Sequence, residues 1–459
     1  MFRIRGGSMN NNTTAYPDPA YAWYVVAILF LAYTVSYIDR QIMSLLIEPI
    51  KQDLAITDTQ VSLLQGFAFT IFYTVAGIPL GRMADRKNRR AIIAAGILVW
   101  SFMTAACGLA RNFALLFLAR IGVGVGEACL SPAAYSLIAD YFPKDKRAMP
   151  ISLYSMGIFF GAGLSFIISG YVIQEVTAAR EIALPMIGVV RPWQLTFFLV
   201  GLPGLLIVAL MSTVREPVRR DLLAIGANKD HVSLSAAGRF LIAHARAYGA
   251  AFLGYSFEAT ISYGFFAWVP SMFVRSFGWE VSRIGYYFGL IVGILGTAGI
   301  LLGGILADRA LHRGVQDAHM RVAMYGAGFI LVFGVAAMCM PTPALVLLML
   351  CPTAVSLGIP VGLAPAAVNY ITPNQLRGQV IAVYIFFAAL IGMTCGPTVV
   401  ALFTDYVYRD PLALRWSLAS FTLLFAVLSI IAFALGLRSF RESAVALLAG
   451  SSGGGPPDS

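Results

Sequence analysis

Long apolar segments recur along nearly the whole chain, and no other feature of the sequence constrains the fold as strongly. A helix needs about 20 apolar residues to cross a hydrocarbon core of about 30 Å. Because lipid offers the backbone no hydrogen-bond partners, such segments are helical. We predict an all-α membrane protein with about twelve transmembrane helices, whose ends are placed to within a few residues: 21 to 47, 59 to 81, 90 to 110, 113 to 139, 148 to 174, 193 to 214, 247 to 274, 282 to 306, 320 to 340, 343 to 370, 377 to 404 and 412 to 437.

The charge content agrees with this prediction and excludes a soluble domain. Only 12% of the residues are charged, whereas a soluble domain averages roughly 25%. The net charge of +10 is not evidence for nucleic-acid binding, because the Lys and Arg residues fall mostly in alternate loops and not in a patch interleaved with aromatics. We therefore expect no nucleic-acid partner.

The basic loops predict the orientation of the chain. The segment RMADRKNRR follows the second helix, and Lys144, Lys146 and Arg147 follow the fourth. By the positive-inside bias, these loops and both termini lie in the cytoplasm. No cleavable signal peptide is evident, since the polar tail at 1 to 20 runs directly into a full-length span. We expect a multi-pass protein of the cell (inner) membrane, with a second tail at 439 to 459 that has a linker-like end.

A long polar insertion divides the chain into two halves. We predict a six-helix bundle at 21 to 214, a cytoplasmic middle loop at 215 to 246, and a second six-helix bundle at 247 to 438. The loop is the only sizeable polar insertion between helices and is rich in Arg. Both halves therefore begin and end on the same side of the membrane.

An internal repeat supports this division. The segment GRMADRKNRR, which begins at Gly81, is echoed by GGILADRALHR, which contains Gly304. The same separation along the chain relates Asp85 to Asp308. Two parallel repeats around a site at the midplane are typical of a transporter whose halves rock against each other.

Two charged side chains lie within one apolar segment, FLARIGVGVGEACLSPAAY. Arg120 and Glu127 are two helical turns apart, so they share a face at a separation of about 10 Å along the axis. Gly122, Gly124 and Gly126 lie between them and leave a surface that another backbone can approach closely. A charge at membrane depth is costly, so we expect both side chains to face a protein cavity and to have a partner.

Asp39 in the first apolar segment is the predicted partner, and we expect it to form a proton-coupling site with Glu127 and Arg120. A guanidinium beside a carboxylate in a low-dielectric site tunes the proton affinity of that carboxylate. In this hypothesis Asp39 and Glu127 exchange protons as the site alternates between the two sides of the membrane. Arg120 holds whichever carboxylate is ionised. A purely structural clamp between helices is the alternative.

Two further charged residues are candidates for an additional site. Arg40 points about 100° away from Asp39 around its helix, toward lipid, a neighbouring helix or the outer interface. Glu258 is the third carboxylate at membrane depth. We expect no metal and no cofactor. All histidines fall in the predicted cytoplasmic loops and are poor membrane proton relays: His231, His244, His312 and His319.

Aromatic side chains are expected to supply the apolar wall of a substrate cavity. Tyr263, Phe266 and Trp268 lie in the seventh predicted helix, and Tyr287 lies in the eighth. They suit an acyl chain or another apolar body. Membrane helices are rich in aromatics in any case, and an interfacial belt explains Trp268 equally well.

The GRMADRKNRR segment resembles the loop signature of the major facilitator superfamily, and LADR at 306 to 309 resembles its degenerate copy. The resemblance covers essentially the whole chain. It implies that Asp85 caps a neighbouring helix and pairs with basic residues, which latches the cytoplasmic side. The alternative is that the charges of this segment only set the orientation of the chain in the membrane. Asn88 stands where the signature usually has Gly. The resemblance assigns these residues to a cytoplasmic gate motif: Gly81, Asp85, Arg86, Arg89, Arg90, Asp308 and Arg309.

Further segments resemble the Spinster branch of that superfamily: YIDRQIMSLLIEPIKQDL, RIGVGVGEA, SPAA and FPKDKRA. This branch is associated with lysolipid and sphingolipid export. The resemblance therefore implies a proton-coupled secondary transporter of amphipathic lipids that works by alternating access. Superfamily precedent implies a monomer.

Two alternatives to lipid transport stay open. Organic-anion symporters of the same superfamily also carry a DR pair in the first helix, and such a protein would use Arg120 as the substrate anchor. A non-transporting membrane receptor is the alternative from another class. We do not expect an enzyme, because the sequence contains no HExxH, GxSxG or GxxxxGK[ST] motif.

Overall fold

The computed structural model describes residues 16–143, 146–178, 182–184, 188–219, 234–373 and 376–452. The side chain of Asp85 and parts of the predicted tails and middle loop lie outside the described residues. The first half of the chain forms these elements: α1 Pro19–Leu45, α2 Ile47–Leu54, α3 Asp58–Ser62, η2 Leu63–Phe67, α4 Ala68–Arg86, α5 Arg89–Cys107, α6 Phe113–Glu127, α7 Leu130–Tyr141, α8 Ala148–Ala178, β1 Ile182–Leu184, β2 Gly188–Val190 and α9 Pro192–Thr213.

Among the described residues of the second half, every regular element is a helix, and single-turn π segments join α12 to α13 and α14 to α15. The strands β1 and β2 of the first half pair antiparallel. The second half forms these elements: α10 Leu234–Ala243, α11 Ala245–Phe277, α12 Val281–Leu290, η4 Ile291–Gly296, α13 Thr297–His312, α14 Ala318–Phe329, η5 Ile330–Gly334, α15 Val335–Cys339, α16 Pro343–Tyr370, α17 Arg377–Leu402, η6 Phe403–Tyr408, η7 Pro411–Ala413 and α18 Leu414–Ser452.

Eleven helical segments within the described residues are long and apolar enough to cross a membrane. The 33-residue α11 is also long enough, but polar side chains such as Ser256, Glu258 and Ser262 make it less apolar than the others. These residues are tolerated because α17 and α18 pack along α11 and most of its side chains are buried. The all-helical membrane fold is thus confirmed with eleven candidate spans, and the side on which the termini lie stays a prediction.

Some helices continue well past their predicted ends. The second predicted helix ends at Arg86 and not at 81, the eighth at His312, and the twelfth at Ser452. The segment RMADR, expected in a loop, is therefore the last turn of α4. Hydropathy locates the end of the apolar core, whereas a helix goes on into water as long as helix-forming residues follow.

The expectation that every histidine lies in a loop is wrong for His312, the last residue of α13, and for His319. His319 lies in the first turn of α14 and is only 6% exposed. The hydroxyl of Tyr255 donates a hydrogen bond to its backbone carbonyl at 3.1 Å. His312 ends α13 and His244 precedes α11, while His231 lies outside the described residues.

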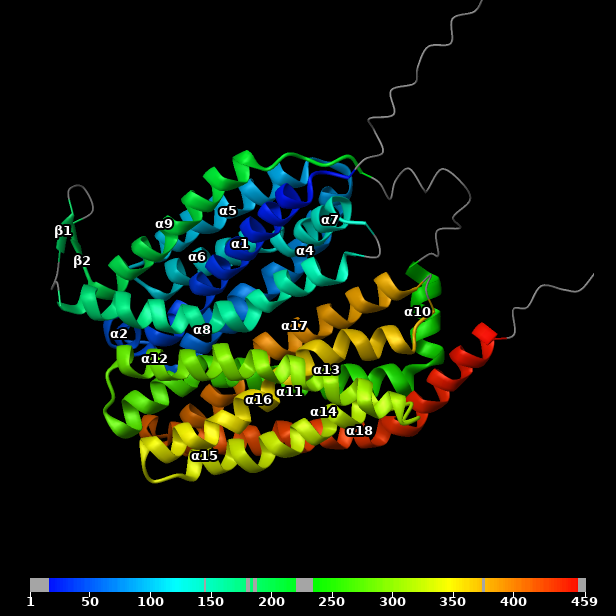
Figure 1. Cartoon of the computed structure of the whole chain (residues 1–459). Coiled ribbons are helices and arrows are strands. Elements are labelled where there is room, and N and C mark those ends of the chain that lie inside the picture. Colours follow the sequence, from blue (N-terminus) through cyan, green and yellow to red (C-terminus); the bar gives the residue numbers. More distant parts are fainter. Residues whose placement is uncertain are drawn as a thin grey trace, which may run out of the picture.

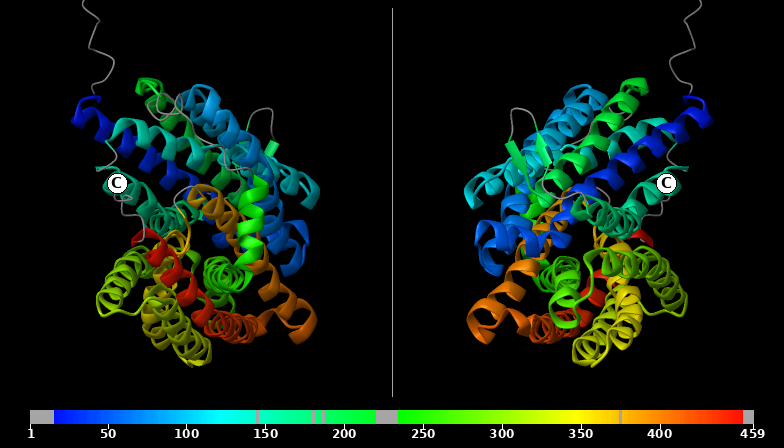
Figure 2. Two further views of the ribbon diagram at one scale, coloured as in Figure 1. Left: turned by 90° about the vertical axis from the view of Figure 1, so that its right-hand side faces the viewer. Right: turned by 90° about the vertical axis from the view of Figure 1, so that its left-hand side faces the viewer.

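The two halves of the sequence occupy two sides of the molecule. Figure 1 shows α1 to α9 above α11 to α18, and the end-on views of Figure 2 show the same two groups. Between them, α8 lies along α12 and η4, and α17 lies along η2 and α4. The predicted middle loop contains the helix α10. The limits of the two bundles stay predictions.

Glycines permit the closest backbone approaches. An ideal Cβ at Gly124 in α6 would lie 2.5 Å from the carbonyl oxygen of Phe69 in α4, which confirms the expectation for this glycine-rich face. The same holds between the halves, where an ideal Cβ at Gly163 in α8 would lie 2.5 Å from the carbonyl oxygen of Gly289 in α12. Neither position accepts a larger side chain unless the helices move apart.

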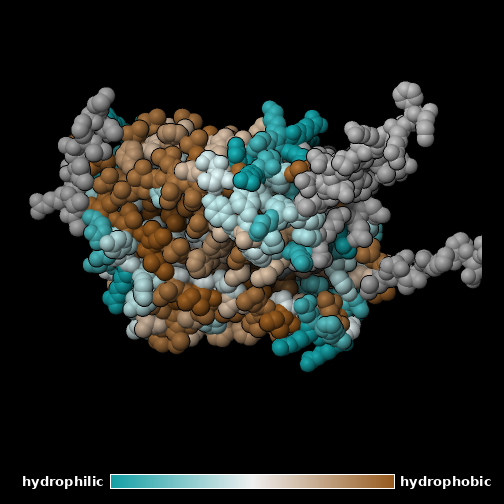
Figure 3. All heavy atoms as spheres, turned by 45° about the horizontal axis from the view of Figure 1, so that its top comes forward, coloured by the Kyte–Doolittle hydropathy of each residue, from teal (hydrophilic) through white to brown (hydrophobic). Residues whose placement is uncertain are grey.

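The outer surface of the helices is apolar. Figure 3 shows hydrophobic side chains over the flanks of the molecule and hydrophilic ones toward its ends. Leu206 is 64% exposed and Leu435 is 77% exposed, and each belongs to a candidate span. Water disfavours a surface of this kind and a hydrocarbon core favours it, which agrees with a multi-pass membrane protein.

Candidate transport site

The helices that carry the central charges begin at regular caps. Asp18 caps α1 by accepting a hydrogen bond from the Ala20 N–H at 2.7 Å, and Pro19 occupies the first helical position. Asn112 caps α6 in the same way, accepting from the Leu115 N–H at 2.9 Å. Both helices then run through the interior of the first half and bring their charged residues together.

Arg40 and Glu127 form a buried ion pair between α1 and α6. The Nη2 of Arg40 lies 2.6 Å from the Oε2 of Glu127. The hydroxyl of Ser36 donates to the same oxygen at 2.7 Å. Because Ser36 and Arg40 are one helical turn apart, α1 presents both donors on one face. The guanidinium also lies over the ring of Phe69 at 4.5 Å from its centre.

Asp39 lies beside this pair without a partner of its own. Its side chain is 0% exposed, and neither carboxylate oxygen has a hydrogen-bond partner among the described residues. Arg120 and Glu127 are the charged groups near it. Arg120 donates to the backbone carbonyls of Asp39 and Leu64, each at 3.4 Å. In this structure Arg40, and not Arg120, forms the ion pair with Glu127.

A cavity of about 230 Å³ lies between the two halves of the molecule. Arg40 is the one charged residue among the described residues that line it. The predicted residues Tyr263 and Phe266 belong to its lining. The remaining wall consists of apolar residues, Ser262 and five tyrosines that are not among the predicted site residues: Tyr33, Tyr37, Tyr73, Tyr255 and Tyr384.

Two predicted aromatic residues do not line this cavity. The indole N–H of Trp268 donates to the carbonyl of Pro397 at 2.9 Å, so this side chain ties α11 to α17. Tyr287 is 42% exposed, and its ring packs against Trp279. Glu258 does not line the cavity either, although its neighbours Tyr255 and Tyr384 do.

Two basic residues of the predicted gate motif, Arg89 and Arg90, contact acids that were not among the predicted site residues. Arg89 is 1% exposed and forms ion pairs with Asp140 and, at 2.7 Å, with Glu216. The backbone N–H of Arg90 donates to the other carboxylate oxygen of Glu216 at 3.1 Å. These contacts lie within the first half and fasten the start of α5 to α7 and to the segment after α9. Arg86 is exposed at the end of α4.

Asn88, which departs from the superfamily signature, has a structural role. It is the N-cap of α5, and its side chain accepts a hydrogen bond from the Ala91 N–H at 2.9 Å. In the second copy of the motif, Asp308 and Arg309 are exposed near the end of α13. An ideal Cβ built on Gly304 would have no neighbouring atom within 4 Å.

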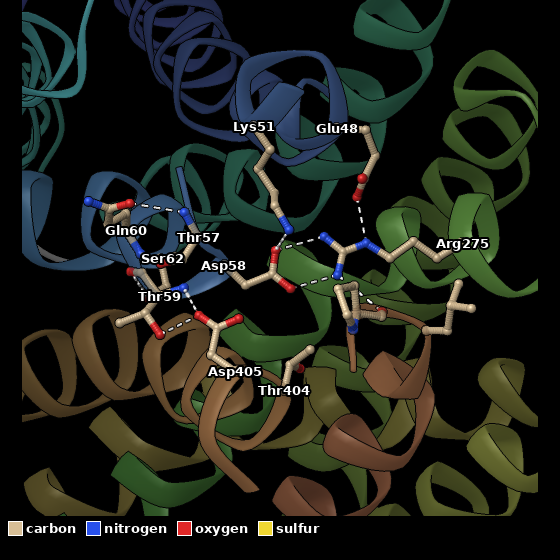
Figure 4. Close-up of polar contacts among 12 residues, drawn as sticks. Glu48, Lys51, Thr57, Asp58, Thr59, Gln60, Ser62, Arg275, Thr404 and Asp405 are labelled. Carbon is tan, nitrogen blue, oxygen red and sulfur yellow. Dashed lines mark hydrogen bonds and ion pairs between the residues drawn. The ribbon is translucent and has the colours of Figure 1, made fainter. Parts of the chain in front are cut away.

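A polar cluster joins the two halves at the end of the molecule that carries α2. Figure 4 shows Arg275 from α11 between Glu48 of α2 and Asp58 of α3. Its Nε lies 2.7 Å from Glu48, and its two terminal nitrogens lie 2.6 and 2.8 Å from Asp58. Lys51 is also paired with Asp58. We call this end of the molecule the closed end.

A second contact closes the same end. The backbone N–H and the hydroxyl of Thr59 in α3 both donate to one carboxylate oxygen of Asp405 in η6, each at 2.7 Å. Figure 4 shows this contact beside the Arg275 cluster. The partners are more than 200 residues apart in sequence, so no local pattern pointed to them.

Comparisons with known proteins fit this architecture. The profile of the Major Facilitator Superfamily matches residues 29–397. An MFS-type efflux pump of Mycolicibacterium smegmatis is 29% identical over 403 residues, which is 85% of this chain and 86% of the pump. A probable L-galactonate transporter of Escherichia coli is 25% identical over 312 residues, or 66% of this chain and 65% of that protein.

Proteins of the Spinster group are also similar to this chain. Human protein spinster homolog 1 is 29% identical over 313 residues, which is 64% of this chain and 56% of that protein. The crystal structure of a bacterial homolog to the human lysosomal transporter Spinster, in an inward-facing and unoccupied conformation, has a TM-score of 0.74 and 24% identity. That comparison covers 94% of this chain and 98% of the other, and it concerns the fold alone.

Proposed function

Because this chain belongs to the Major Facilitator Superfamily, and is therefore a secondary transporter of a small molecule and not an enzyme, we propose that it moves amphipathic lipids by alternating access, coupled to protons. Its substrates are lysophospholipids or sphingosine-phosphate-like molecules, which combine a negatively charged phosphate group with a hydrocarbon chain. The supporting observation is the cavity between the halves, where Arg40 stands among aromatic and apolar side chains. The protein works as a monomer in the cell (inner) membrane, with both termini in the cytoplasm.

Coupling follows from competition for one guanidinium. Arg40 holds Glu127 at 2.6 Å and also faces the cavity. An anionic head group that binds Arg40 displaces Glu127, and a carboxylate left at membrane depth without a cation takes up a proton. Asp39, which lacks a hydrogen-bond partner, is the second proton site. Arg120 does not line the cavity, and it stabilises the ionised form of either carboxylate.

Alternating access requires the closed end to open. The contacts of Arg275 with Asp58 and of Thr59 with Asp405 join opposite halves, so all of them break in the alternative conformation. The close approach of Gly163 to Gly289 lies between α8 and α12, where one half meets the other. We assign this contact the part of a pivot, because small residues let two helices roll without a clash.

A symporter of small organic anions is the second candidate, and the size of the cavity favours it. A volume of about 230 Å³ lies below the range of roughly 300 to 1,000 Å³ that is usual for drug-sized ligands. The similarity to a probable L-galactonate transporter points the same way. In this candidate Arg40, which lines the cavity, is the anchor in place of Arg120.

Transport by purified protein in proteoliposomes distinguishes the two candidates. Radiolabelled lysophosphatidylethanolamine and radiolabelled galactonate are offered in parallel, with the membrane potential clamped. We expect the lysolipid to cross at a rate that protein-free vesicles do not reach, and Arg40→Gln to abolish this rate. If galactonate crosses and the lysolipid does not, lipid transport is excluded and the second candidate replaces it.

A further inference from the structure

Glu258 in α11 is the third carboxylate at membrane depth, and its surroundings differ from those of Glu127. Its side chain is 0% exposed, and neither carboxylate oxygen has a hydrogen-bond partner among the described residues. Glu127, in contrast, is held by Arg40 and Ser36. Glu258 is therefore a buried acid that no cation neutralises within the described part of the chain.

Two other polar side chains of α11, those of Thr260 and Ser262, are accommodated without this cost. The hydroxyl of Thr260 donates to the carbonyl of Ser256 at 2.8 Å, and the hydroxyl of Ser262 donates to the carbonyl of Glu258 at 3.2 Å. A carboxylate cannot turn back onto its own helix in this way, because carbonyl groups offer it no donor. An ionised carboxylate in such a place costs several kcal/mol, so the side chain carries a proton in this conformation.

The carboxyl group lies just behind the wall of the central cavity. Tyr255 and Tyr384 are the ionisable groups near Glu258, and both line the cavity. On another side stands the backbone of α14, where an ideal Cβ at Gly326 would lie 3.8 Å from the Oε1 of Glu258. The two tyrosines are therefore the groups that are both near the carboxyl group and part of the cavity wall.

One of these tyrosines is tied to a neighbouring helix, and the other belongs to a helix that reaches the closed end. The hydroxyl of Tyr255 donates to the backbone of His319 at 3.1 Å, which ties it to α14. Tyr384 lies in α17, and α17 continues through η6 to the closed end. There Asp405 accepts its hydrogen bonds from Thr59 of the other half. In the proposed opening of this end the contact breaks, and α17 then moves together with Tyr384.

We propose that Glu258 is a second proton-binding site of this transporter, located in the C-terminal half. It exchanges its proton with the central cavity, and the movement of α17 opens and closes that route. The inference rests on the proposed proton-coupled function and deepens it. The site adds one proton to those carried by Asp39 and Glu127 in each transport cycle.

The test counts protons and lipids in the same vesicles. Purified protein in proteoliposomes transports radiolabelled lysophosphatidylethanolamine while entrapped pyranine reports the protons that cross. Glu258→Gln keeps the shape of the side chain and cannot titrate, whereas Glu258→Asp keeps the acid. Ser256→Ala is the matched control, because Ser256 is also 0% exposed on α11 and its hydroxyl oxygen also lacks a partner. We expect Glu258→Gln to lose one proton per lipid, and the other two variants to keep the wild-type ratio.

Infrared spectroscopy tests the protonation of Glu258 without transport. At neutral pH the spectrum of the wild type minus that of Glu258→Gln should contain the carbonyl band of a protonated carboxylic acid. A difference spectrum without this band overturns the proposal. A second result also overturns it. If Glu258→Gln lacks the carbonyl band but moves as many protons per lipid as the wild type, Glu258 is a neutral structural residue. If the wild type itself moves lipid without protons, the proposed coupling fails as well, and that result is recognised before any variant is compared.

Discussion

Replacing Arg275 with glutamine shifts the molecule away from the conformation in which the closed end is shut. The guanidinium makes three hydrogen bonds of 2.6 to 2.8 Å to Glu48 and Asp58, and its side chain is 5% exposed. Hydrogen bonds to charged groups contribute about 1.5 to 3 kcal/mol each. The loss is smaller than their sum, because Lys51 still neutralises Asp58 and Glu48 is 23% exposed and screened by water.

We take about 2 kcal/mol for the whole contact, which corresponds to about a 30-fold change in the equilibrium between shut and open. Pulsed electron paramagnetic resonance measures this equilibrium as a distance distribution between spin labels. Gln52 in α2 and Glu280 before α12 are exposed positions on opposite halves for the labels, introduced in a cysteine-free background. We expect Arg275→Gln to move most of the population to longer distances if the shut and open states of the wild type differ in free energy by less than the contribution of this contact.

The matched control is Arg283→Gln at the same end of the molecule. Arg283 is exposed, and its guanidinium lies 4.1 Å from the ring centre of Trp279 within its own half. This variant should leave the distance distribution unchanged. The reasoning is refuted if Arg275→Gln leaves the short-distance population intact, or if Arg283→Gln depletes it to the same extent.

Three further predictions concern single residues. Asn88→Ala should destabilise the protein by about 1 kcal/mol in detergent unfolding and Asn88→Gly by only a few tenths, because glycine is tolerated at an N-cap. Gly163→Leu should block lysolipid transport with normal membrane insertion, because even a Cβ would lie 2.5 Å from the Gly289 carbonyl oxygen. Burial raises the pKa of Asp317, but hydrogen bonds from Arg321 and Arg441 outweigh this and hold the pKa below its usual value. The ionised carboxylate therefore stabilises the folded state when the pH is above the pKa that Asp317 has in the unfolded chain. This stabilisation is lost as the pH falls through the lower pKa of the folded state. Asp317→Asn should accordingly lower the unfolding temperature at neutral pH and leave it unchanged in acid.

The membrane helices could be predicted because lipid imposes a length and a composition on each span. Their ends could not be predicted as well, since α18 runs on to Ser452 after its apolar part is over. This extension brings Arg441 to Asp317, a contact that hydropathy does not report. α11 shows the reverse case, because its polar residues are tolerated by burial against other helices and not by lipid.

The charged residues of the candidate site could be selected from the sequence as buried groups, but their pairing could not. Arg40 lies about 100° from Asp39 around the helix, and the sequence leaves open whether it faces lipid, a neighbouring helix or the outer interface. In a bundle α1 has protein on most of its sides, so a residue turned by that angle still meets another helix, here at Glu127. The cluster around Arg275 was missed because its partners come from distant parts of the chain.

The central claim is that protons drive transport through Glu127, and one comparison tests it most directly. Wild type and Glu127→Gln are reconstituted in proteoliposomes, and labelled lysolipid is followed with an imposed pH gradient and then with equal pH on both sides. We predict that the gradient accelerates net flux in the wild type only, while exchange of lysolipid at equal pH persists in both. A Glu127→Gln protein that still responds to the pH gradient like the wild type would contradict this claim.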